Sequence, residues 1–186
     1  KISREVKYAM STQSIRTNFL GTETSFSVSG AWLSYWILLL RLTAGWWMLH
    51  AGLDKIWAWP FDASWFVGGA AQGTILAPFV TPFSDGILLA FVNVAVPLGQ
   101  TAIGLGLILG VLTRTAAFFG AFMMLFFYFI NGYGGGWANG MVTGELLGIM
   151  VFGTIVALGA GGVLAVDNRL REMELFENTR LRKLLG

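Results

Sequence analysis

Four stretches of the chain are long and apolar, and they restrict the possible folds more than any other feature does. They are, approximately, residues 32–53, 87–109, 115–131 and 142–166. Within them only Arg41 and Glu145 carry a charge when histidine is neutral. About 20 apolar residues cross the hydrocarbon core of a bilayer as a helix. Because lipid offers no hydrogen-bond partners, a spanning segment has to be helical. The sequence therefore predicts an all-α integral membrane protein whose transmembrane domain, residues 32–166, is a four-helix bundle.

The segments outside these stretches are predicted to lie at the two membrane surfaces. Residues 1–31 are polar and show no strong period, and a short surface helix is the element considered there. The loop 56–86 is rich in aromatic residues, which favours an interfacial position with a short helix at about 62–71. This loop either seals the outer end of the bundle or forms a wall of a ligand pocket. The tail 167–186 mixes both charges with spaced apolar residues, which is typical of an amphipathic cytoplasmic helix.

The basic residues predict the orientation of the chain in the membrane. Lysine and arginine favour the cytoplasmic flanks of spanning helices. With both termini inside, ten of the 12 Lys and Arg residues fall on the inner side. Lys55 is then the single basic residue at the outer edge, and Arg41 lies within the membrane. We therefore expect a multi-pass protein with both termini in the cytoplasm.

Composition excludes several kinds of chemistry. The chain has no cysteine, so it forms no disulfide, thiolate nucleophile or cysteine-ligated iron–sulfur cluster. Its one histidine, His50, and the spacing of its acidic residues predict no metal site. The net charge of +2 comes largely from the membrane-flanking residues, so nucleic-acid binding is not expected. Electron carriers in any redox function would be diffusible or would belong to partner subunits.

Polar residues inside the spans are the candidate ligand-binding residues, because ionisable groups in a bilayer are costly. At a rise of 1.5 Å per residue, Arg41 and Gln100 both lie roughly 20 Å below the outer ends of their helices, so we predict that they are neighbours near the midplane. Arg41 either binds an anionic or carbonyl-bearing ligand or is tied to Gln100, Asn93 and backbone carbonyls. Gln100 and Asn93 also suit interhelical hydrogen bonds, as does Asn131.

Three further groups are expected near the outer surface. Glu145 is either a pocket carboxylate or proton carrier, or an interfacial residue at the start of its helix that the helix dipole stabilises. Lys55 is either a ligand-binding cation or a marker of the membrane edge. His50 and Asp54 lie four residues apart, a spacing that permits a hydrogen bond on one helix face. That pair is either a proton relay or an ordinary surface pair.

Short motifs give the chain a family resemblance. They are Arg41-Leu42, Gly45, Gly52 and Asp54-Lys55 in the first span, Gly104 to Gly110 and Leu112-Thr113-Arg114 around the end of the second, and Gly159 to Gly162 with Asp167 after the fourth. In order and spacing they resemble the DoxX/DoxD family of small four-helix proteins in prokaryotic plasma membranes. The resemblance covers about residues 32–167. Its DoxD branch is known as a membrane subunit of thiosulfate:quinone oxidoreductase.

The resemblance implies a function within a membrane complex and a link to quinone. It places Arg41 and Lys55 at the family's basic positions. Members often carry an acid in the middle of the second span, where this chain has Gln100, which implies that a proton step served by that acid is absent here. Three functions stay open: a subunit of a respiratory quinone-linked oxidoreductase complex, a non-catalytic accessory subunit of a larger membrane complex, and a small transporter.

Overall fold

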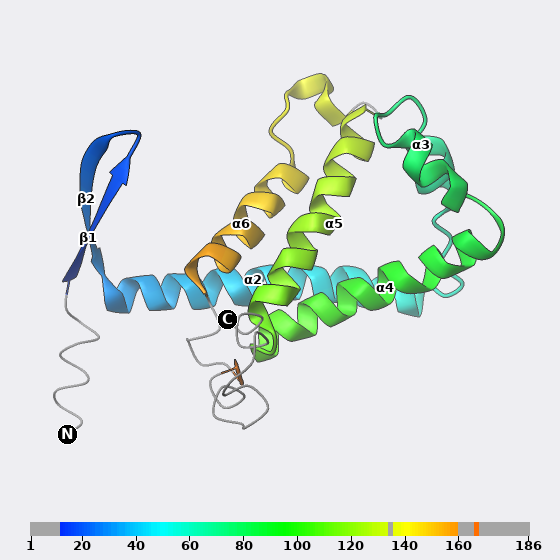
Figure 1. The fold of residues 1–186 in the computed structure, drawn as a ribbon. Helices are drawn as coiled ribbons and strands as arrows, with labels where there is room; N and C mark the ends of the chain where they lie inside the picture. Colours follow the sequence, from blue (N-terminus) through cyan, green and yellow to red (C-terminus); the bar gives the residue numbers. More distant parts are fainter. Residues whose placement is uncertain (1–11, 134–135, 160–165, 168–186) are drawn as a thin grey trace, which may run out of the picture.

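The computed structural model describes residues 12–133, 136–159 and 166–167, and most of this part is helical (Figure 1). The long helices are α2 (Gly30–Trp57), α4 (Gly86–Leu109), α5 (Thr113–Tyr133) and α6 (Gly144–Leu158). A helix thus occupies each predicted apolar stretch. By length and composition, α4 and α5 can each cross a bilayer, whereas α6 is a shorter apolar helix of 15 residues and α2, although it has 28 residues, is less apolar. The predicted amphipathic tail lies outside the described residues, apart from Asp167.

The N-terminal segment differs from the prediction. Instead of a short helix, β1 (Thr12–Phe19) and β2 (Thr22–Ser29) form an antiparallel hairpin that stands beside the start of α2 (Figure 1). The two turn residues, Leu20 and Gly21, have φ angles of 51° and 82°, and positive values at both positions are typical of a tight hairpin turn. Successive side chains of a strand point to opposite faces, a period of two residues, which a search for helical periods does not detect. The all-α prediction is therefore wrong for this segment.

The fourth helix is shorter than predicted. Helix α6 ends at Leu158 because Gly159 adopts a left-handed conformation, with a φ of 62°, and its N–H bonds to the carbonyl of Ile155. Glycine takes this conformation without steric cost and commonly ends helices. The predicted continuation of this span to residue 166 is wrong at Gly159, and residues 160–165 lie outside the described part. Gly110 ends α4 in the same way, with a φ of 69°.

The helices pack as two antiparallel pairs, α2 with α4 and α5 with α6. Glycines bring the first pair close together: a side chain at Gly104 would collide with the backbone of Leu49, and one at Gly45 would lie 2.9 Å from Ile108. In the second pair, Gly120 accommodates the ring of Phe152. The buried core between the pairs consists of Ile37, Ala44, Met48, Ile103, Leu107, Ala117, Met124, Phe152 and Ile155.

Helices α4 and α5 diverge from their shared turn, and the outer loop spans the gap between their far ends (Figure 1). The loop contains η1 (Trp65–Ala70), one turn of π-helix, followed by α3 (Ala77–Val80) and η2 (Thr81–Phe83). The expected short helix at 62–71 therefore exists as the single turn η1. A second short turn, η3 (Gly136–Asn139), precedes α6.

Candidate functional site

A large cavity lies where α4 and α5 diverge. It has a volume of about 910 Å³, and the outer loop covers one end of it. Its wall is almost entirely apolar, and the apolar side chains come from α4, α5 and the outer loop. They include Phe91, Val96 and Ile103 from α4, Phe119, Met123 and Phe127 from α5, and Phe61, Phe66 and Val67 from the loop. The outer loop was expected either to seal the outer end of the bundle or to form a wall of a ligand pocket, and the structure supports the pocket wall.

The cavity opens sideways, toward the surface that lipid would cover. Three phenylalanines of its wall, Phe91, Phe119 and Phe122, are 64%, 52% and 50% exposed. A ring that both lines the cavity and faces outward marks its mouth. The site is therefore a cleft that an apolar molecule could enter from the bilayer, rather than a closed void.

The polar side chains of the described cavity wall are Lys55, near the end of α2, and Asn131, near the end of α5. Lys55 is in the last turn of α2, where its Nζ donates a hydrogen bond of 3.0 Å to the carbonyl of Ala51. The same ammonium lies 5.8 Å from the centre of the Phe61 ring, a favourable distance for a cation over an aromatic face. Lys55 is half-buried, so its charge faces the cavity from a partly desolvated position.

Asn131 connects the cavity wall to Glu145. Its Nδ2 donates a hydrogen bond of 2.8 Å to Glu145 Oε1, across the contact between α5 and α6. The predicted interhelical hydrogen bond of Asn131 is thereby confirmed. Both side chains are half-buried, and Glu145 lies in the first turn of α6, where a negative charge is stabilised by the helix dipole. Glu145 itself does not belong to the cavity wall; it contacts the wall through Asn131.

Asn93 holds the outer loop against α4. Its Oδ1 accepts a hydrogen bond of 2.8 Å from the N–H of Ala63. Just before, Asp62 accepts from the N–H of Ser64 at 2.9 Å and from its hydroxyl at 2.8 Å, and these bonds lower the pKa of Asp62 below its usual value. A bond from Asn93 to the Asp62 carboxylate lowers this pKa slightly further. Asn93 therefore shapes the site by fixing the loop and is not one of the wall residues.

The predicted pairing of Arg41 with Gln100 is wrong. Gly45 faces Gly104 and Ile108, and Gly52 faces Pro97, so Arg41 lies level with the turn that follows α4. Gln100 is level with Gly52, about three helical turns away. The expectation failed because the ends of α2 and α4 lie at different heights, so counting turns from them gives the wrong register.

Arg41 is only 1% exposed, and its charge interacts with that of Asp167. Asp167 is fully buried, and its carboxylate accepts hydrogen bonds from the N–H groups of Leu112 and Thr113, at 2.7 and 3.0 Å. These N–H groups begin α5 and have no partner within the helix. Of the two expectations for Arg41, this arrangement supports a structural guanidinium. Gln100 is 3% exposed, and its Oε1 accepts no hydrogen bond from the described part of the chain.

His50 and Asp54 form the predicted pair. Nδ1 of His50 lies 3.0 Å from Oδ2 of Asp54, and their side chains are 60% and 58% exposed. The pair is outside the cavity wall, which favours the ordinary surface pair over a relay serving this cavity. Among the described residues, no group of three or more His, Asp or Glu side chains could hold a metal ion.

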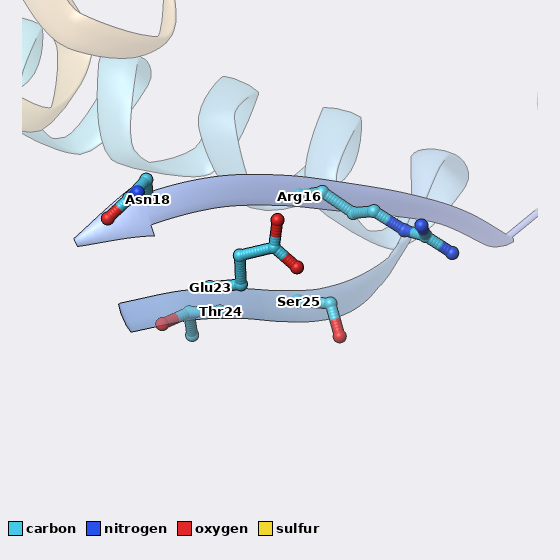
Figure 2. A pocket seen from close by; sticks show the side chains of 5 residues that line it. All are labelled: Arg16, Asn18, Glu23, Thr24 and Ser25. Carbon is cyan, nitrogen blue, oxygen red and sulfur yellow. The ribbon is translucent and has the colours of Figure 1, made fainter. Parts of the chain in front are cut away.

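A second hollow lies on the hairpin, far from these groups in the sequence. It has a volume of about 350 Å³ and is lined by Arg16, Asn18, Glu23, Thr24 and Ser25. Figure 2 shows the carboxylate of Glu23 pointing toward β1, whereas the guanidinium of Arg16 points away along its strand. All five residues are exposed, so the hollow is a shallow polar surface with no buried group to recognise a ligand.

The aromatic wall of the cavity was not identified from the sequence. Its signal was present in α5, where Phe119, Phe122, Met123, Phe126 and Phe127 recur at helical spacing. In a membrane protein this pattern fits a lipid-facing helix equally well, so it does not distinguish a cavity wall from an outer surface.

The fold and cavity define a class: helical membrane proteins with a lateral apolar cleft. The family model named DoxX matches residues 36–132, just over half of the chain, and the chain belongs to this family. It is therefore a membrane protein in contact with the lipid bilayer. No curated protein and no solved structure matches the chain. The matched segment contains every residue of the cavity wall, whereas Glu145 lies beyond it.

Proposed function

We propose that the chain is the quinone-binding membrane subunit of a multi-subunit, respiratory quinone-linked oxidoreductase. It would lie in the plasma membrane of a prokaryote with both termini in the cytoplasm. The observation that carries the proposal is the lateral cavity of about 910 Å³, with an apolar wall in which Lys55 and Asn131 are the polar side chains among the described residues. This volume is within the range of about 300–1,000 Å³ that small-molecule sites occupy.

The polarity of the cavity matches the structure of a lipophilic quinone. A quinone has a ring with two carbonyl oxygens, and its isoprenoid tail is apolar. Lys55 or Asn131 can hydrogen-bond an oxygen of the ring, and the phenylalanines of α4 and α5 can cover the tail. The sideways opening between Phe91 and Phe119 leaves room for the rest of the tail in the bilayer. A free anion such as thiosulfate fits this wall poorly, because burying a charge among apolar groups is costly.

The electrons for quinone reduction would come from a partner subunit. The chain has no cysteine, so it has no cysteine-ligated redox centre of its own. Its contribution to the complex is to bind quinone, to orient it, and to keep water away from most of its surface. When the quinone is bound, it supplies the redox chemistry.

A variant that fills the cavity tests the proposal. Val96 lines the cavity from α4, and Val94, two residues earlier on the same helix, faces outward with 43% exposure. We expect V96W to weaken the binding of a decyl-substituted benzoquinone by at least about tenfold, and V94W to leave it unchanged. Binding is measured as an equilibrium dissociation constant of the purified protein in detergent micelles. Equal binding by wild type, V96W and V94W would refute the cavity as the quinone site.

A second function, that of an accessory subunit holding a structural lipid, is favoured by one observation. The described cavity wall contains no carboxylate or imidazole, and Lys55 is its one titratable side chain. Direct proton delivery to a bound quinone is therefore limited to the ammonium. A mass-spectrometric inventory of molecules retained after gentle extraction distinguishes the two functions. Quinone bound in about equimolar amount favours the oxidoreductase subunit, and phospholipid alone favours the accessory subunit.

A further inference from the structure

One face of α2 stays exposed along the whole length of the helix, opposite the face that packs against α4. At 3.6 residues per turn, the exposed residues of this face fall within about 80° of one another around the helix axis. We call this face the α2 stripe. It consists of Trp32, Trp36, Leu39, Thr43, Trp46, His50, Asp54 and Trp57. The stripe combines large aromatic side chains with the ionisable pair of His50 and Asp54, which is unusual for a surface that only lipid covers.

The alignment of α2 with α4 fixes the level of this pair along α4. Gly52 lies against Thr101, and the two helices run antiparallel. At equal rise per residue, Asp54 is therefore about level with the middle of the 24-residue helix α4, and His50 is about one turn nearer its C-terminal end. Because α4 is apolar throughout and long enough to cross a bilayer, a membrane that it crosses surrounds both side chains with acyl chains.

The internal contact of the pair satisfies only half of its polar atoms. Nδ1 of His50 lies 3.0 Å from Oδ2 of Asp54, which leaves the second ring nitrogen and the second carboxylate oxygen for another partner. The two side chains are 60% and 58% exposed, so these atoms are open to the surroundings. Acyl chains have no hydrogen-bonding groups, and ionisable side chains at this depth usually face protein. A protein surface with its own polar groups at the same depth should therefore cover the stripe.

We infer that the α2 stripe is the contact surface of a homodimer, in which it packs against the same stripe of a second copy. From Trp32 to His50 the stripe residues are spaced alternately four and three apart, the spacing that lets two helices interlock side by side. A two-fold axis along the membrane normal brings identical residues together at equal depth. Each imidazole and carboxylate then meets an identical pair, and an imidazole and a carboxylate are complementary in charge and hydrogen bonding. The second copy thus supplies the matching polar groups at the required depth.

The contact is independent of the ligand proposed for the cavity. Lys55 is the residue of α2 that lines the cavity, and it belongs to the other face of the helix. A homodimer formed through the stripe therefore leaves the lateral opening between α4 and α5 free. Its failure would leave the quinone proposal in place, and failure of quinone binding would leave the dimer in place.

Cross-linking of single-cysteine variants tests the contact, because the chain itself has no cysteine. Thr43→Cys puts a thiol in the stripe, and Thr154→Cys, at an exposed threonine of α6, is the matched control. Two copies of residue 43 should approach within the Cα separation of about 4.4–6.8 Å that a disulfide needs. After oxidation with copper phenanthroline in the membranes of the expressing cells, most of T43C should run as a disulfide-linked dimer and T154C as a monomer. Equal cross-linking of the two variants, or linkage of T43C to a different protein alone, would refute the homodimer.

A second measurement tests the polar pair. His50→Phe keeps an aromatic ring and removes both ring nitrogens, whereas Thr154→Val removes a polar group from the outer face of α6. Single-molecule photobleaching of labelled protein in liposomes, over a range of dilutions, gives the association constant of the dimer. H50F should lower it about fivefold or more, because two symmetry-related contacts lose a hydrogen bond, and T154V should leave it unchanged. Wild-type helicity shows that each variant is folded. A wild-type protein that is monomeric at every dilution, or an unchanged constant in H50F, would overturn the inference.

Discussion

The carboxylate of Asp167 should be one of the main stabilising groups of the helical fold. It is fully buried and accepts the N–H groups of Leu112 and Thr113, which begin α5. Its charge also interacts with the buried guanidinium of Arg41 on α2. One side chain therefore connects the end of the described chain, the turn after α4 and the first helix. Removing it should affect all three.

The size of the effect follows from these contacts. A hydrogen bond to a charged group contributes about 1.5–3 kcal/mol, and breaking a buried charge pair typically costs about 3–5 kcal/mol. These terms overlap because the same carboxylate makes both contacts. We expect Asp167→Ala to lower the free energy of unfolding by about 4 kcal/mol. Asp167→Asn should lower it by about 2 kcal/mol, because the amide oxygen can still accept one of the two N–H groups.

Equilibrium unfolding in mixed micelles, with sodium dodecyl sulfate as denaturant and far-ultraviolet circular dichroism as the signal, measures these values. Asp54→Ala is the control, since this exposed carboxylate should contribute less than about 1 kcal/mol. In D167A, the further change Arg41→Met should cost less than it does in wild type, because the interaction between Arg41 and Asp167 is already lost. A loss in D167A no larger than that in D54A would refute this account of the turn.

Three smaller predictions follow from other contacts. Gly104→Val should destabilise the protein by about 3 kcal/mol or more, measured by the same unfolding assay, since its side chain would collide with the backbone of α2. Asn93→Ala should increase proteolytic cleavage of the outer loop at constant helicity, since the N–H of Ala63 loses its partner. Hydrogen bonds from Ser64 lower the folded-state pKa of Asp62, so this carboxylate stabilises the loop above the unfolded-state pKa near 3.8 and loses the effect as the pH falls through the lower folded value. The stability difference between wild type and Asp62→Ala should therefore be constant at neutral pH and vanish in acid.

The sequence predicted the helices well because their signal is local. A long apolar stretch in lipid can only be helical, so composition alone locates α4 and α5. The hydrogen bond between His50 and Asp54 was also predictable, since a spacing of four residues places both groups on one helix face. Helix locations and contacts between residues of the same helix can therefore be predicted from the sequence.

The register between helices was not predictable in the same way. The depth of Arg41 was counted from the end of its own helix, but the residues that surround Arg41 depend on how α2 and α4 are aligned along their axes. That alignment is fixed by the close contacts of Gly45, Gly52 and Gly104, which appear only when both helices are in place. The partner of Arg41 is also distant in sequence: Asp167 follows the fourth apolar stretch, more than 100 residues later.

The cavity itself results from an uneven distribution of small and large side chains. Glycines occur where α2 meets α4 and where α5 meets α6, so each pair closes tightly. Between α4 and α5 the facing side chains include Phe91, Phe122 and Met123, and Gly99 meets only the end of Met123, at 3.5 Å. Bulky groups on both faces keep the two helices apart beyond their shared turn, and the loop held by Asn93 covers the open end. The cleft is thus a consequence of close packing elsewhere. A substitution that loosens α2 against α4 should therefore alter ligand binding although it lies outside the cavity wall.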